Sequence, residues 1–297
     1  MNNMSENEIR ICCLILNYND SNTVVKLVES IKGYRSLNYI LIVDNCSTDG
    51  SYEFISNKYR TNRNIICVKS EKNGGYGYGN NFGIKYAQEN LGCKLVLLSN
   101  PDVIFSEECI TNLIDFSKTV EKFGIIAPIQ LDRNRKIIRD YAWKIPSVFS
   151  YTMTVLYLMQ YMFSTSYPKK LIKTSDALEV DCVPGSLLLI NADAFLEVGG
   201  YDERMFLFCE ENTIGFKLKQ SGYKSYVCTK YSYIHMHGVS IEKSITKKRK
   251  RNDLLLTNRF LFMKDYLKAS KIQLGFARFI YWLSDKEMIA RILIKGN

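Results

Sequence analysis

The sequence predicts an α/β protein with a mainly parallel central sheet flanked by helices and a helical C-terminal extension. Short apolar runs alternate with helical segments through the first hundred residues. Strands and helices at this spacing are typical of right-handed β-α-β units. Clusters rich in Asn and Asp follow several of the apolar runs. In parallel sheets the carboxyl ends of the strands form the edge where ligands bind.

Apolar composition and flanking turn residues define the expected elements. Strands are expected at 9–16, 38–43, 64–68, 94–98 and 124–129. A further strand is expected at 180–191, bent by Pro184 and Gly185. Helices are expected to end near residues 31, 58 and 90, and another is expected at 107–122. Residues 131–175 are poorly patterned and are expected to lie over the sheet.

Polar side chains close three of the predicted strands. Asn17 and Asn19 follow the first, Asp44 and Asn45 the second, and Asn100 and Asp102 the fourth. Pro101 cannot donate to a sheet ladder, so the fourth strand must end before Asp102. A carboxylate at this edge suits a hard divalent cation that also touches phosphate. Alternatively, Asn100 and Asp102 cap the backbone of a turn.

A glycine-rich segment at 73–81 precedes the third helix and contains Gly74, Gly75, Asn80 and Asn81. Glycine permits close approach to the backbone, and a helix N-terminus favours anions. The segment fits neither G-x-G-x-x-G nor G-K-[ST]. A dinucleotide-dependent oxidoreductase and a P-loop enzyme are therefore disfavoured.

Two adjacent acids, Glu210 and Glu211, stand at the start of a predicted helix. Acids in a first turn can complement the helix dipole. They can also supply a general base beside a second, positioning acid.

The chain has 297 residues and a formal net charge of +10. The excess of cations favours an anionic partner. The front of the chain lacks the mixed aromatic and basic pattern of RNA-binding sheets, so we expect no nucleic-acid partner. The nine cysteines are scattered without a C-x-x-C pair, which predicts free thiols in a reducing compartment.

We expect neither an N-terminal signal region nor a membrane-spanning helix, because no apolar run is long enough. Residues 272–293 mix large apolar side chains with cations. This pattern suits either a helix lying in a membrane interface or a helix packed on its own domain.

Taken in order, five motifs resemble those of glycosyltransferase family 2, whose members have the GT-A fold. They are ILNYND at 15–20, VDNCSTDGS at 43–51, NGGYGYGNNFGI at 73–84, SNPDV at 99–103 and the segment 184–212. The resemblance covers about residues 11–264 and is greatest to bacterial rhamnosyltransferase-type members that build cell-surface polysaccharides. It implies a GT-A catalytic domain at 1–240, with its acceptor side at about 130–240, and a basic helical region at 241–297.

The family resemblance implies inverting transfer of rhamnose or another hexose from a UDP- or dTDP-sugar. The acceptor would be a saccharide or a lipid-linked saccharide, and the enzyme would act in the cytoplasm or at the inner face of an anionic membrane. Asp102 and His235 would bind Mn²⁺ or Mg²⁺, with His237 as the alternative to His235. Glu211 would be the catalytic base, with Glu210 as the alternative. The donor would contact the side chains or backbone of Asn17, Asn19, Asp44, Asn45, Asp49, Gly74, Gly75, Asn80, Asn81 and Asn100.

The chain departs from the family pattern at Thr213, where an acid is usual. A non-catalytic sugar-nucleotide-binding protein is therefore an alternative. A sugar nucleotidyltransferase is a weaker one, because its glycine-rich phosphate loop is expected near the first strand.

Overall fold

One mixed sheet organises the protein. The computed structural model describes residues 9–236 and 248–295, and describes side chains at 9–236 and 250–287. The strands are β1 (Ile11–Asn17), β2 (Tyr39–Asp44), β3 (Ile65–Lys69), β4 (Leu95–Ser99), β5 (Val103–Ile104), β6 (Phe123–Leu131), β7 (Ala177–Val180), β8 (Leu187–Asn191) and β9 (Lys224–His235). The helices are α1 (Ser21–Ile31), α2 (Ser51–Tyr59), α3 (Tyr76–Leu91), α4 (Glu107–Ser117), α5 (Val148–Met153), α6 (Met159–Met162), the 3-10 helix η1 (Lys169–Lys173), α7 (Ala192–Glu197), α8 (Glu210–Gln220), α10 (Lys248–Asp265) and α11 (Lys271–Lys295).

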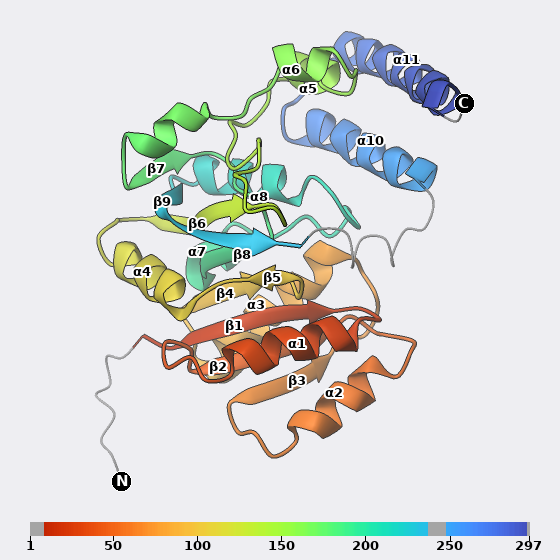
Figure 1. The fold of residues 1–297 in the computed structure, drawn as a ribbon. Coiled ribbons are helices and arrows are strands. Elements are labelled where there is room, and N and C mark those ends of the chain that lie inside the picture. Colours follow the sequence, from red (N-terminus) through yellow and green to blue (C-terminus); the bar gives the residue numbers. More distant parts are fainter. Residues whose placement is uncertain (1–8, 237–247, 296–297) are drawn as a thin grey trace.

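The strand order is β3-β2-β1-β4-β8-β6-β9-β5, and β7 also pairs with β9. Strands β1 to β4 are parallel where they pair, which confirms the β-α-β units predicted for the first hundred residues. β8 runs antiparallel to both β4 and β6, whereas β6 and β9 are parallel. The predicted α/β fold with a mainly parallel sheet flanked by helices is therefore confirmed (Figure 1).

Alternating side chains of the buried strands supply two cores, one on each face of the sheet. Cys13 and Ile15 of β1 pack with residues of α1, α2 and α4 on one face. Their neighbours Cys12 and Leu14 pack with residues of α3, α7 and α8 on the other. Because both faces of β1 are covered by helices, its sequence is continuously apolar.

A third core joins the C-terminal helices to the rest of the protein. Phe262 and Met263 of α10 are fully buried and pack with Tyr151 of α5 and with Met205 and Cys209, which precede α8. The predicted helical C-terminal region is thus built onto the segment that leads into the two acids. The expected boundary at 240–241 lies outside the described residues.

Three expected elements differ in the structure. The prediction of a single bent strand at 180–191 is wrong, because residues 181–186 leave the sheet between β7 and β8. The helix expected at 107–122 ends at Ser117. The glycine-rich segment is a loop only to Gly75, since α3 begins at Tyr76. A Cβ added at Gly79 would lie 2.4 Å from Leu16 Cδ1, so that glycine permits close packing of α3 on β1.

All nine cysteines are free thiols, as predicted, and most are buried. Over the described ranges, none of the helices combines the length and apolarity that crossing a membrane requires.

Candidate active site

A cavity of about 630 Å³ opens at the carboxyl ends of β1 and β4. Six of the predicted site residues line it: Asn45, Gly75, Asn100, Glu210, Glu211 and His235. Aromatic rings also line the cavity, among them Trp143, Phe163 and Phe208. Carboxylates, amides, an imidazole and rings therefore meet in one cavity.

The first two strand ends are joined by hydrogen bonds, as their parallel pairing predicted. Asn17 Nδ2 donates to Asp44 Oδ2 at 2.7 Å, and the Ser47 backbone N–H donates to Asp44 Oδ1 at 2.8 Å. Asp44 is completely buried, and its carboxylate orders the turn behind the cavity wall. Asn45 Nδ2 donates to Asn73 Oδ1 and to the carbonyl of Gly75, which ties this wall to the loop before α3.

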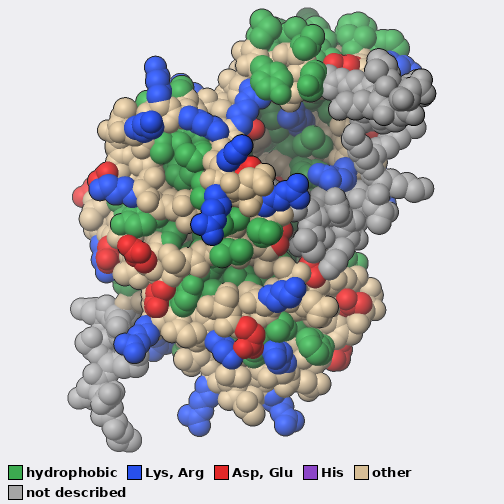
Figure 2. All heavy atoms as spheres, viewed as in Figure 1, with side chains coloured by type: hydrophobic (Ala, Val, Ile, Leu, Met, Phe, Trp, Pro, Cys, Tyr) green, Lys and Arg blue, Asp and Glu red, His purple; other side chains and the backbone are tan. Residues whose placement is uncertain are grey.

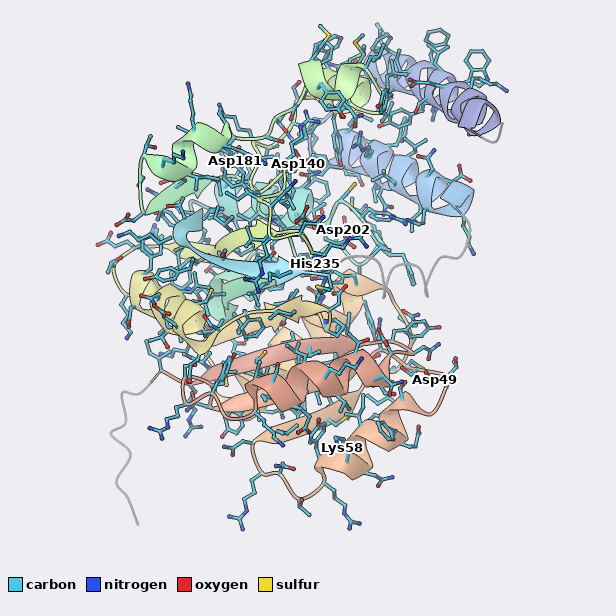
Figure 3. All side chains as sticks on the ribbon, viewed as in Figure 1. Asp49, Lys58, Asp140, Asp181, Asp202 and His235 are labelled. Atoms are coloured by element: carbon cyan, nitrogen blue, oxygen red, sulfur yellow. The ribbon has the colours of Figure 1, made fainter. Side chains whose placement is uncertain are left out.

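Asp102 and His235 meet at the next strand end. His235 Nε2 lies 3.1 Å from Asp102 Oδ1, and the two side chains are 12% and 6% exposed. The pairing of β5 with β9 places Val103 opposite His235, which carries Asp102 to the imidazole. Figure 3 shows His235 near the centre of the molecule, whereas Asp49 lies far from it near α2.

Three further side chains form a hydrogen-bonded network behind the Nδ1 atom of His235. Gln130 Nε2 lies 3.1 Å from His235 Nδ1. Gln130 Oε1 accepts from the Ser186 and Tyr233 hydroxyls at 3.3 and 3.1 Å. A partner on Nδ1 fixes the ring's orientation and leaves Nε2 directed at Asp102.

A carboxylate oxygen and an imidazole nitrogen are both ordinary ligands of Mn²⁺. Among the described residues, no group of three or more His, Cys, Asp or Glu side chains could hold a metal ion. An ion held by the Asp102–His235 pair would need its other ligands from a substrate phosphate and water. His237, the alternative ligand, lies outside the described residues.

The two acids begin α8 on a strained segment of backbone. Phe208 and Cys209, which directly precede Glu210, have φ of 78° and 71°. Residues other than glycine rarely adopt these angles, and they persist where the surroundings enforce them. Asn258 of α10 supplies part of that enforcement, since its Nδ2 donates to the carbonyls of Leu207 and Phe208 at 2.8 and 3.2 Å.

Burial governs the electrostatics of this acid pair. Burial raises the pKa of Glu210 well above its usual range, and the neighbouring charge of Glu211 raises it further. Glu210 is 4% exposed, and its Oε1 has no hydrogen-bond partner among the described residues. Burial also raises the pKa of Glu211, while the backbone N–H groups of Glu211 and Gly185 lower it. We infer that Glu211 ionises before Glu210.

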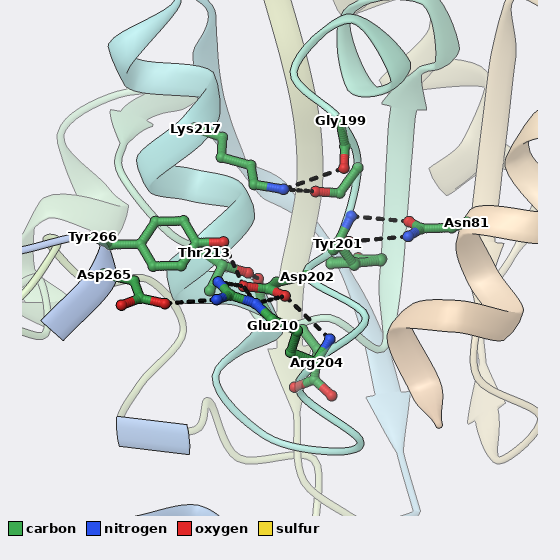
Figure 4. A network of polar contacts seen from close by, with 11 residues as sticks. Asn81, Gly199, Tyr201, Asp202, Arg204, Glu210, Thr213, Lys217, Asp265 and Tyr266 are labelled. Carbon is green, nitrogen blue, oxygen red and sulfur yellow. Dashed lines mark hydrogen bonds and ion pairs between the residues drawn. The ribbon is translucent and has the colours of Figure 1, made fainter. Parts of the chain in front are cut away.

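A polar network holds the loop between α7 and α8 in place (Figure 4). Arg204 bridges Asp202 and Asp265 of α10, with the shortest contact to each at 2.6 Å. Burial raises the pKa of Asp202, but hydrogen bonds from Arg204 and Tyr266 outweigh it and bring the pKa to about 2. The loop that leads to Glu210 is therefore anchored to α10 by charge as well as by packing.

The structure does not bring every predicted site residue to the cavity wall. Asp49 accepts from the backbone and the hydroxyl of Ser51 at the start of α2. Asn80 donates to the Tyr76 carbonyl, and Asn81 binds the backbone of Tyr201. Neither these three residues nor Asn17, Asn19, Asp44, Gly74 and Asp102 are among those that line the cavity.

Asp102 differs from the others, because it contacts His235, which does line the cavity. The structure also adds residues for which the motifs predicted no role: Trp143, Gln130, Ser186 and Asn258. Trp143 lines the cavity, and its indole N–H donates to Asn212 Oδ1 at 2.7 Å. It comes from the poorly patterned segment, which gave no signal for it.

Comparison with known proteins shows the family to which this chain belongs. The model of the family described as Glycosyl transferase family 2 matches residues 12–199, well over half of the chain. The protein therefore belongs to glycosyltransferase family 2, as the motifs indicated.

Two curated relatives have names that specify a rhamnosyltransferase. The chain is 27% identical over 206 residues to an N-acetylglucosaminyl-diphospho-decaprenol L-rhamnosyltransferase of Mycobacterium tuberculosis, covering 66% of each protein. It is 27% identical over 201 residues to the rhamnosyltransferase WbbL of Escherichia coli, covering 65% of this chain and 72% of WbbL. The match thus spans just under two thirds of the mycobacterial relative.

Solved structures confirm the GT-A-like fold. A mannosyltransferase from Pyrobaculum calidifontis, solved with GDP-Man and Mn²⁺, aligns over 97% of this chain and 79% of its own, with a TM-score of 0.59 and 12% identity. GalNAc-T7, solved with UDP, GalNAc and Mn²⁺, aligns over 79% of this chain and 45% of its own, with a TM-score of 0.62 and 15% identity.

Proposed function

We propose that the protein transfers a hexose, with rhamnose as the first candidate, from a UDP- or dTDP-sugar to a hydroxyl of a saccharide or lipid-linked saccharide, with inversion at the anomeric carbon. The observation that carries this proposal is that His235, which contacts Asp102, lines the same cavity as Glu210 and Glu211. Family membership and the relatives' names support the sugar and acceptor classes.

Asp102 and His235 would hold Mn²⁺ or Mg²⁺ at the donor's diphosphate. The bound ion would neutralise the charge that develops on the leaving diphosphate. Asn45, Gly75 and Asn100 line the same cavity and would position the nucleotide.

Glu211 would take the proton of the acceptor hydroxyl as its oxygen attacks the anomeric carbon. Glu210 would lose its proton after Glu211, so the negative charge of the pair would first lie on Glu211. The rings of Trp143 and Phe208 line the cavity and suit the apolar faces of an acceptor sugar. We further propose that the reaction takes place in the cytoplasm, at the inner face of the membrane.

A thermal-shift panel tests the donor. UDP- and dTDP-sugars are each added with and without Mn²⁺, and the productive donor should raise Tm more when the ion is present. Release of nucleoside diphosphate in the absence of acceptor would then separate an enzyme from a protein that only binds sugar nucleotides. Binding without release over prolonged incubation would support the binding-only alternative.

That alternative draws on Thr213, which stands where the family usually has an acid. In the structure, the buried Thr213 hydroxyl donates to the Glu210 carbonyl at 2.9 Å. The hydroxyl therefore stabilises the first turn of α8, and both carboxylates of the pair remain at the cavity.

A further inference from the structure

Large exposed hydrophobic side chains gather at one end of the molecule. Of thirteen such residues in the described chain, nine lie on α11 or on the segment 148–162 that contains α5 and α6. We call these nine the aromatic face: Phe149, Tyr157, Leu158, Tyr161, Met162, Ile272, Phe276, Phe279 and Trp282. Figure 2 shows hydrophobic side chains clustered at this end of the molecule, and Figure 1 places α5, α6 and α11 there.

Ring contacts make the aromatic face continuous across the two segments. Phe149 of α5 stacks on Phe276 of α11 with ring centroids 6.5 Å apart. Tyr157 contacts Tyr161 edge to face at 6.3 Å, and Phe279 stacks on Trp282 at 6.1 Å. These residues therefore form one surface patch, of the kind that monomeric soluble proteins seldom leave in contact with water.

α11 is apolar on two opposite sides. Ala277, Ile280 and Tyr281 are buried on the side that packs toward α5 and α10. Ile272, Phe276, Phe279 and Trp282 recur at spacings of four, three and three residues on the other side, and are 42–85% exposed. Packing on its own domain, one of the two sequence expectations for this helix, explains only the buried side.

Cations border the aromatic face. Arg139 lies over the Tyr161 ring at 4.4 Å, and Lys286 lies over the Trp282 ring at 5.8 Å. The Glu287 carboxylate is turned to the backbone N–H of Tyr157 at 3.1 Å. Tryptophan and tyrosine are enriched at membrane interfaces, and nearby cations add attraction to anionic lipid headgroups.

The aromatic face also adjoins the cavity. Phe163 packs against Phe149 with centroids 5.3 Å apart, and Phe163 itself lines the cavity. Gln160 and Arg139 line the cavity too, and Arg139 donates to the Gln160 carbonyl. A bilayer on the aromatic face would thus lie beside this part of the cavity wall.

We propose that the aromatic face docks the protein on an anionic phospholipid bilayer and so presents the cavity to acceptors anchored in it. The value of docking for catalysis rests on the proposed function, whereas docking itself requires neither donor nor acceptor. Arg139 and Lys286 would meet the headgroups, and the rings would enter the interface.

Co-sedimentation with vesicles tests the proposal. The full chain should bind phosphatidylglycerol–phosphatidylcholine vesicles, and bind phosphatidylcholine alone more weakly. Phe279→Ser with Trp282→Ser should lower the partition coefficient by about tenfold or more, because both side chains are 55% exposed on α11. Leu158→Ser with Met162→Ser tests the α6 side independently, should the first pair fail to fold.

Phe54→Ser is the matched control. Phe54 is 52% exposed on α2, at the far end of the sheet from α11, and its replacement should leave vesicle binding unchanged. The proposal would be overturned if the wild type did not bind vesicles, or if both double variants bound them as strongly as the wild type. It would also be overturned by a dimer in light scattering that the same substitutions dissociate, since a second copy would then cover the face.

Donor-induced thermal shifts separate this inference from the proposed function. If the double variants keep the donor response and act on a soluble acceptor but not on a vesicle-bound one, docking is established together with the activity. If the wild type uses both acceptors without binding vesicles, only the docking proposal fails. If it binds vesicles but no donor, only the proposed function fails.

Discussion

Replacing Glu210 by Gln is expected to stabilise the folded protein at neutral and alkaline pH. Glu210 is almost fully buried, its Oε1 has no hydrogen-bond partner in the part of the chain that the structure describes, and Glu211 lies beside it. Its pKa is raised on folding, so its effect on stability is most favourable at acidic pH and is lost as pH rises toward the folded-state pKa. The amide of Gln does not ionise, so the variant does not lose this stability as pH rises.

The magnitude follows from the raised pKa, because each unit by which the folded-state pKa exceeds the unfolded-state value costs about 1.4 kcal/mol of stability once the pH has passed the folded-state pKa. One such unit corresponds to a Tm difference of about 3–6 °C in a domain of roughly 150–250 residues. Scanning calorimetry of the wild type and of Glu210→Gln from acidic to alkaline pH measures the difference. The gain should grow with pH and vanish at acidic pH, where both proteins carry a neutral side chain.

Glu211→Gln is the matched variant for catalysis. If Glu211 is the base, this change should lower kcat by about 10²–10⁴-fold. The acidic limb of the kcat profile should reflect Glu211 and persist in Glu210→Gln, because the pKa of Glu211 is set by burial and backbone donors. A Glu210→Gln variant that is less stable than the wild type at alkaline pH would refute the electrostatic reasoning. If Glu210→Gln alone abolished transfer, the roles of the two acids would be reversed.

Three further substitutions test the rest of the site. Asp102→Asn should abolish the Mn²⁺-dependent part of the donor thermal shift, whereas Asp115→Asn, at an exposed acid on α4, should retain it. Asn258→Ala should cost about 1–3 kcal/mol in urea unfolding and lower kcat, because two partly buried carbonyls lose a donor. Gly75→Ala should weaken donor binding and destabilise by more than about 1 kcal/mol, since its Cβ would lie 2.2 Å from the Phe206 carbonyl oxygen. Gly222→Ala has a similar positive φ with nothing within 4 Å, so it isolates the cost of the backbone angle. Wild-type behaviour of Asp102→Asn, Asn258→Ala or Gly75→Ala would contradict the role assigned to that residue.

The first hundred residues were largely predictable, because local patterns decide them. A buried parallel strand reads as a continuous apolar run, and its polar end is adjacent in sequence. Asn17, Asp44 and Asn45 could therefore be placed at one edge before any contact was known. The segment 180–191 was misassigned as one strand, because an apolar run does not show where the backbone leaves the sheet.

The sequence by itself determined the family, the strand ends and the residue types of the site, since these depend on short motifs and on composition. Only the tertiary structure decided which of those residues share a cavity. Asp102 and His235 are 133 positions apart and meet through antiparallel strand pairing, which no local pattern encodes. Likewise, Asn258 reaches the acid-bearing loop because α10 packs against it, and that packing depends on shapes contributed by distant segments.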